Sequence, residues 1–231
     1  MAAMSPFLAL AVICVSLATV VLARRLASPR PRPAEQAAHA ALPAAFAIAA
    51  FLAAESYGAA PHVQALATLV CALAGALSVV DGRCGWAPHS LVVPLVACAA
   101  PLAVALRSPA DGVTLIGTSA AGALAFLAAD RAFMRGAFRT PPGDVAMLAL
   151  IPSLLWNAPA ALAAAGVTLA LLAVRRFRPG YAIDLMSPED KADAVSDLEE
   201  LGGAPRTDWA PMGPLCGLVV LASVLSGFSF G

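Results

Sequence analysis

Long apolar runs separated by short polar segments constrain this chain more than any other feature of its sequence. Several of them are long enough to cross a bilayer, which takes about 20 residues in a helix. Only 12% of the 231 residues are charged, half the share of a soluble domain, so the polar groups could not cover a water-facing surface. We therefore expect an all-α, polytopic integral membrane protein, with residues 1–231 forming a single transmembrane domain. The expected spans, about eight in number, are residues 5–23, 40–57, 62–80, 90–106, 113–129, 145–157, 159–174 and 212–230.

The placement of basic residues predicts how these spans are oriented. Arg24 and Arg25 follow the first apolar run, whereas a signal peptide carries its positive charges before that run, so we expect a retained helix. With the N-terminus outside, thirteen of the fourteen basic residues fall in inner loops and only Arg107 falls outside, as the positive-inside rule requires. The inner residues are Arg24, Arg25, Arg30, Arg32, Arg83, Arg131, Arg135, Arg139, Arg175, Arg176, Arg178, Lys191 and Arg206.

Two aspartates fall at the inner ends of predicted spans. Asp81 ends the third span and Asp144 opens the sixth. Two carboxyls that share a site can divide the work of acid and base, because one keeps a proton while the other is ionised. The helix dipole favours the ionised form at the start of a helix and the protonated form at its end, so we expect Asp144 to be the base and Asp81 the acid. Taken singly, each aspartate also fits a structural role, as a helix cap or a helix-ending turn.

The segment D-G-R-C-G-W-A-P-H, from Asp81 to His89, resembles a sequence element of the type IV prepilin peptidases and preflagellin peptidases. That element reads D-x-R-x-x-x-I-P followed by Asn or Asp. Arg83 and Pro88 occupy its arginine and proline positions, while Ala87 and His89 depart from it.

Two further segments resemble the same family, in the same order along the chain. P-P-G-D-V-A, from Pro141 to Ala146, resembles G-x-G-D-V-K and matches it at Gly143, Asp144 and Val145. P-M-G-P-L, residues 211–215, resembles the P-F-G-P-F-L that begins the family's last helix. Pro141 replaces the first glycine of the GxGD motif and Ala146 replaces the usual lysine, and both changes leave open whether activity is weakened.

The resemblance implies an aspartyl endopeptidase of the intramembrane GxGD class in a bacterial or archaeal inner (plasma) membrane. It would remove the short basic leader of a prepilin or pseudopilin at the cytoplasmic face, before type IV pilus assembly or protein secretion. Asp81 and Asp144 would be catalytic, and Arg83, Pro88 and Gly143 would bind substrate or position the loops. The expected partners are this substrate and the lipid bilayer, with no metal, no cofactor and no nucleic acid.

Two other classes of function remain open. A proton- or cation-coupled transporter could use Asp81 and Asp144 as its ion site, although transport predicts more polar residues at mid-membrane depth. A catalytically weakened relative could instead act in pilus or secretion assembly.

The loops and the spacing of the cysteines add three expectations. Many bacterial members of the resembled family carry a methyltransferase segment with CxxC pairs between the first two helices. Here the loop is short, most of it residues 28–39, and it has no cysteine, so we expect no methyltransferase activity. The five cysteines of the chain form no CxxC pair, which argues against a zinc site. The loop 175–210 is acidic and contains a predicted short amphipathic helix, and its surface is a candidate for holding a basic leader.

Overall fold

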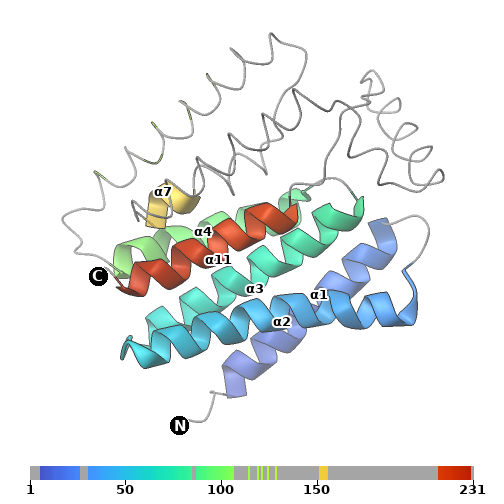
Figure 1. Ribbon diagram of the computed structural model, residues 1–231, viewed down its shortest axis with the longest axis horizontal. Coiled ribbons are helices and arrows are strands. Elements are labelled where there is room, and N and C mark those ends of the chain that lie inside the picture. The colour runs from blue at the N-terminus through green and yellow to red at the C-terminus, as the bar shows by residue number, and fades with distance from the viewer. Residues whose placement is uncertain are drawn as a thin grey trace.

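The computed structural model describes residues 6–26, 31–84, 87–106, 151–155 and 213–229, with the single positions 114, 119, 121, 124 and 128. The elements in this part of the chain are all helices, as the sequence predicts (Figure 1). They are α1 (Pro6–Leu26), α2 (Pro33–Ser56), α3 (Pro61–Cys84), α4 (His89–Ala105), α7 (Ile151–Leu155) and α11 (Gly213–Ser229).

Three of these helices are long and apolar enough to cross a membrane. The stretches are Leu8–Leu26 in α1, Pro33–Ser56 in α2 and Pro61–Arg83 in α3, while α4 and α11 are shorter apolar helices. Large apolar side chains also face outward: on α1 they form a stripe at helical spacing, and they recur on α2, α4 and α11. The stripe on α1 consists of Leu10, Ile13, Leu17 and Val21. An apolar outer surface of this kind suits lipid as the solvent, and together with the three candidate spans it suggests a membrane protein.

The predicted spans agree with the described helices to different degrees. Those at 5–23, 62–80, 90–106 and 212–230 correspond to α1, α3, α4 and α11, and α7 lies inside the predicted span 145–157. The predicted span 159–174 and the acidic loop 175–210 lie outside the described residues.

The predicted loop between the first two spans is wrong from Pro33 onward, because α2 begins there, seven residues before the expected start. Pro33 occupies the first helical position, where its missing N–H costs no hydrogen bond. The Glu35 carboxylate accepts a hydrogen bond from the Arg32 N–H at 3.1 Å, and the Gln36 N–H donates to the Arg32 carbonyl at 3.0 Å. The alanines, the glutamate and the glutamine that follow have strong helix propensity. Because they include no large apolar side chain, the hydrophobic pattern alone predicts a loop here.

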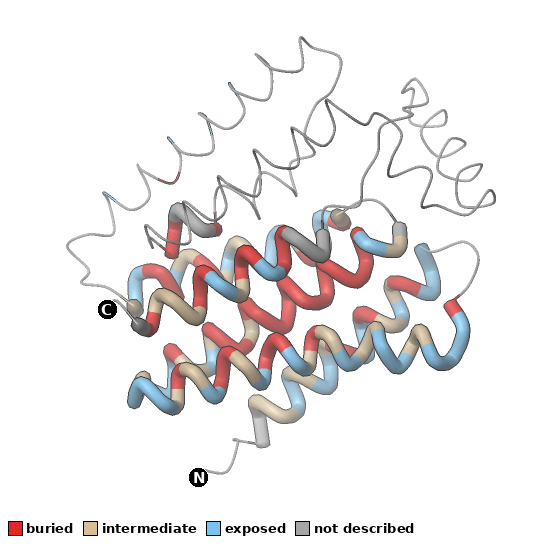
Figure 2. The backbone as a smooth tube through the Cα atoms, in the orientation of Figure 1, coloured by how far each residue is buried: buried red, intermediate tan, exposed pale blue. Residues whose placement is uncertain are grey.

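Helix α3 lies at the centre of the described bundle. It contacts α1, α2, α4 and α11, and every residue from Val70 to Asp81 is buried (Figure 2). This stretch, C-A-L-A-G-A-L-S from Cys71 to Ser78, is rich in small residues, which let neighbouring helix backbones approach closely. The helix that carries Asp81 therefore packs against four of the other described helices.

Two glycines mark the closest approaches to α3. A β-carbon built on Gly75 would lie 2.8 Å from the Pro43 Cα, so the backbones of α3 and α2 touch there. A β-carbon on Gly217 of α11 would collide with the Ser78 hydroxyl and lie 3.1 Å from the Ala74 carbonyl oxygen. Both contacts require hydrogen in place of a side chain.

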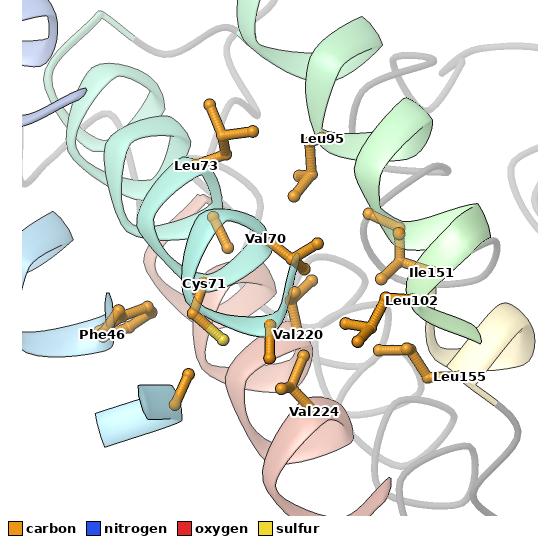
Figure 3. Close-up of a cluster of buried hydrophobic side chains, with 14 of the residues drawn as sticks. Phe46, Val70, Cys71, Leu73, Leu95, Leu102, Ile151, Leu155, Val220 and Val224 are labelled. Carbon is orange, nitrogen blue, oxygen red and sulfur yellow. The ribbon is translucent and has the colours of Figure 1, made fainter. Parts of the chain in front are cut away.

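Apolar side chains from five helices form one continuous core around α3. Val70 and Cys71 of α3 lie among residues of the other helices that are separated from them in sequence (Figure 3). These include Phe46 of α2, Leu95 and Leu102 of α4, Ile151 and Leu155 of α7, and Val220 and Val224 of α11. The segment that follows Asp144 in the sequence thus joins the same core through α7.

Four of the buried hydroxyls in the described helices are satisfied within their own helices, whereas the buried Ser16 hydroxyl has no hydrogen-bond partner. Thr19, Thr68, Ser78 and Ser223 each donate to the carbonyl four residues earlier, at 2.7 Å. In an apolar surrounding this back-bonding removes the cost of an unpaired hydroxyl.

Candidate functional site

Asp81 is a buried acid at the end of an otherwise apolar stretch. It lies in the last turn of α3 and is only 4% exposed. Glu35 and Glu55, the other acids in the described part of the chain, are half-buried. Burying a carboxylate costs several kcal/mol unless it is paired, hydrogen-bonded or protonated, so the state of the Asp81 carboxyl depends on the groups around it.

Arg83 follows two residues later in the same turn and contacts a second helix. Its Nη2 atom lies 3.8 Å from the Glu35 Oε2 of α2, and the two side chains are 27% and 43% exposed. His39, one turn after Glu35 on α2, is close enough for the charges of both Arg83 and Glu35 to act on its imidazole. The start of α2 thus supplies two ionisable groups to the end of α3 that carries Asp81.

Pro88 begins α4 on the other side of the short α3–α4 connection. It is buried, its backbone is extended (φ −68°, ψ 135°), and its carbonyl accepts the N–H groups of Leu91 and Val92 at 2.9 and 3.1 Å. Proline suits this position because it fixes φ and needs no N–H partner. Asp81 and Arg83 at the end of α3 and Pro88 at the start of α4, three of the predicted site residues, therefore belong to two helices that are consecutive in the sequence and packed together.

Contacts at the opposite end of the bundle fix the direction of the helices. Tyr57, just after α2, stacks on Phe228 near the end of α11, with ring centroids 6.3 Å apart. Gly227 lies beside Leu106, which follows α4. Helices α2, α4 and α11 therefore end together, and α3 runs against them, because Arg83 near its end contacts Glu35 near the start of α2.

All four arginines of the described residues gather at the end of the bundle that holds Asp81. Arg24 and Arg25 end α1, Arg32 precedes α2 and Arg83 ends α3, and these helix ends lie on one side in Figure 1. Tyr57 marks the opposite end. The positive-inside rule predicts that an end with this many arginines faces the cytoplasm.

Two predicted site residues, Asp144 and Gly143, lie outside the described residues, as do Pro141 and Ala146. The structure also places Glu35 and His39 near Arg83, although both residues lie in the predicted loop 28–39. A glutamate three residues after Arg32, behind a proline, was the signal of a helix start that could have found them.

No metal-binding group is evident in the part of the chain that the structure describes. No three His, Cys, Asp or Glu side chains there are grouped so as to hold an ion. Cys14, Cys71 and Cys98 are free thiols.

Comparison with known proteins adds no relative: no family model, curated protein or solved structure matches the chain. A function for this chain therefore has to follow from the chemistry and placement of its own residues, above all the buried carboxyl of Asp81 at the arginine-rich end of the central helix.

Proposed function

We propose that this chain is an aspartyl endopeptidase that removes the basic leader of a prepilin or pseudopilin at the inner membrane face, with Asp81 and Asp144 as its catalytic pair. The observation that carries this proposal is the position of Asp81, which is buried in the last turn of α3 at the arginine-rich end. Arg83 and Pro88, which share a sequence element with Asp81, flank the same turn.

The chemistry requires one proton on the pair. The Asp144 carboxylate takes a proton from water as the water oxygen bonds to the scissile carbonyl carbon. Asp81 gives its proton to the amide nitrogen, the C–N bond breaks, and the products are a leader carboxyl and a free amine. Because one carboxyl gains the proton that the other loses, a final transfer between them restores the resting pair, and general acid–base catalysis of this kind contributes about 10²–10⁴-fold.

The eight-span arrangement is part of the proposal, and the helix directions support it. Helices α4 and α11 run the same way, since Leu106 and Gly227 near their ends lie together. An odd number of crossings must separate two parallel spans, and the three predicted between them, at 113–129, 145–157 and 159–174, meet this requirement. The predicted acidic loop 175–210 would then be cytoplasmic, on the side of Asp81.

A transporter that uses the same aspartates is the weaker alternative. A proton path needs polar groups free to exchange partners across the bilayer. Within the described helices, the buried hydroxyls of Thr68, Ser78 and Ser223 are instead bound to carbonyls of their own helices.

Leader removal can be measured directly. A reporter with a lysine-containing leader before an apolar helix would be co-expressed with the wild-type chain, Asp81→Ala or Asp144→Ala, and its N-terminus identified by mass spectrometry. We expect a new N-terminus with the wild type alone. Equal processing by all three would remove the protease proposal, and none by any of them would favour the assembly role.

A further inference from the structure

The first part of α2 is a helix that extends away from the buried bundle. No side chain from Pro33 to Leu42 is buried, and burial begins at Pro43 (Figure 2). The extension is nevertheless fixed in direction, because Glu35 in its first turn contacts Arg83 at the end of α3. It therefore holds a carboxylate beside the turn that carries Asp81.

The two contacts of this carboxylate differ in strength. Glu35 Oε2 accepts the Arg32 backbone N–H at 3.1 Å, a short bond that orients the side chain at the helix start. Its distance to Arg83 Nη2 is longer, 3.8 Å, and both side chains of that pair are partly open to water. An exposed pair of this kind stabilises only weakly, so a second cation could replace Arg83 at little cost.

The position of the pair suits a peptide that also reaches Asp81. Arg83 lies two residues beyond Asp81, which is about 3 Å along the helix axis. The Asp81 and Arg83 side chains lie on different sides of α3, because residues two apart in a helix do not face each other. An extended peptide advances about 3.3 Å per residue, so about three or four residues beyond a cation held at Glu35 suffice to pass around a helix about 10 Å across and reach Asp81.

We propose that Glu35 binds a positive charge of the substrate leader, with a leader lysine or arginine replacing Arg83 at its carboxylate. This inference rests on the proposed function, and it names the residue that would select a basic leader. It differs from the hypothesis that the acidic loop 175–210 holds the leader, because it assigns the contact to one carboxylate on a described helix.

The test is a charge-pairing cycle with two reporters, one with a lysine leader and one with those lysines changed to glutamine. Full-length protein in nanodiscs would carry Glu35→Gln, which keeps an acceptor for the Arg32 N–H. We expect kcat/KM for the lysine reporter to fall about threefold to fivefold, as for loss of a partly exposed ion pair, with less than a twofold change for the glutamine reporter. Equal loss for both reporters would mean a structural role for Glu35 and would overturn the inference.

Three further variants sharpen the cycle. Glu55→Gln removes an acid at the other end of the same helix and should leave both reporters unaffected. Arg83→Gln removes the resident cation and should tighten binding of the lysine reporter severalfold. Weaker binding of that reporter would contradict the exchange. A further variant with the acids of 184–208 changed to glutamine should keep the Glu35 preference, and loss of that preference would assign it to the loop.

Binding measured without hydrolysis separates this inference from the proposed function. In an Asp81→Asn background, the affinity of each fluorescent reporter is compared between protein that keeps Glu35 and protein that also carries Glu35→Gln. If the wild type cleaves nothing but the lysine reporter still depends on Glu35, the binding site stands and the protease assignment fails. If the affinities show no such dependence, the inference fails whether or not cleavage occurs.

Discussion

Gly75 of α3 and Pro43 of α2 form a backbone contact with no room for a side chain, since a β-carbon on Gly75 would lie 2.8 Å from the Pro43 Cα and 3.1 Å from its nitrogen. Pro43 has no N–H to donate to the carbonyl of His39, so α2 lacks one helical hydrogen bond at this crossing. The contact holds the two helices together between the core and the extension that carries Glu35.

Gly75→Ala should therefore destabilise the bundle. Neither backbone can yield as a flexible side chain would, and overpacking of this kind costs about 1–3 kcal/mol. Unfolding by SDS in mixed micelles would measure the loss. Gly227→Ala is the matched control, because its β-carbon would meet only the Cδ1 of Leu106, the end of a flexible side chain, at 3.2 Å. Equal stability of the two variants would contradict the contact.

The contact between Gly217 of α11 and Ser78 of α3 predicts that a second substitution restores part of the stability that the first one removes. Gly217→Ala should destabilise by about 1–3 kcal/mol, because the new methyl group would collide with the Ser78 hydroxyl. Ser78→Ala alone should cost little, since that hydroxyl bonds only to Ala74 of its own helix among the contacts described. The double variant should be at least about 1 kcal/mol more stable than the sum of the two losses, as coupled neighbours are. Additive losses would mean that the residues do not touch.

Asp81→Asn should separate activity from stability. Removing the acid should lower leader cleavage by about 100-fold or more. The free energy of unfolding should stay the same or rise by up to about 2 kcal/mol, as is common where a site holds an unfavourable group. A large loss of stability, measured in the same SDS titration, would identify Asp81 as a structural residue instead.

The orientation can be tested by labelling single cysteines in a cysteine-free background. Arg32→Cys, at the arginine-rich end, should react with an impermeant maleimide only after the cells are opened. Tyr57→Cys, at the other end, should react in intact cells. The opposite pattern would place the Asp81 end outside. The five native cysteines are changed to alanine or serine first, and retained reporter cleavage checks that background.

The aromatic contact between Tyr57 and Phe228 should stabilise the end of the bundle opposite Asp81. The rings are stacked at 12° between planes, and such pairs contribute about 0.5–1.5 kcal/mol beyond their buried area. Tyr57→Leu keeps apolar bulk and removes the ring, so its loss of stability should fall in this range. A variant as stable as the wild type would show that the stacking contributes nothing.

The sequence predicted helices best where apolar residues run without interruption. The third and fourth helices start within one residue of their predicted positions, because a long apolar run in lipid has only the helix as a way to bond its backbone. The start of α2 was missed because Ala34 to His39 are polar or small and give no apolar signal, although they favour a helix.

The site was predicted in part for a related reason. Asp81 was recognisable as an acid that ends an apolar run, which is a local feature. The contact of Arg83 with Glu35 joins residues 48 positions apart, and only the antiparallel packing of α2 on α3 brings them together. Likewise, no local pattern identifies α3 as the central helix, because its central position depends on which helices pack against its small residues.

The length of α3 from Pro61 to Asp81 has a consequence for selectivity. Twenty residues of helix rise about 30 Å, which matches the hydrocarbon thickness of a typical bilayer. If Pro61 lies at one boundary of the hydrocarbon, the Asp81 carboxyl lies at the other. The length of the helix then sets the depth of the carboxyl, so an inserted substrate presents to it only the peptide bonds at this boundary. Bilayer thickness, as well as the sequence of the substrate, would decide which bond is cut.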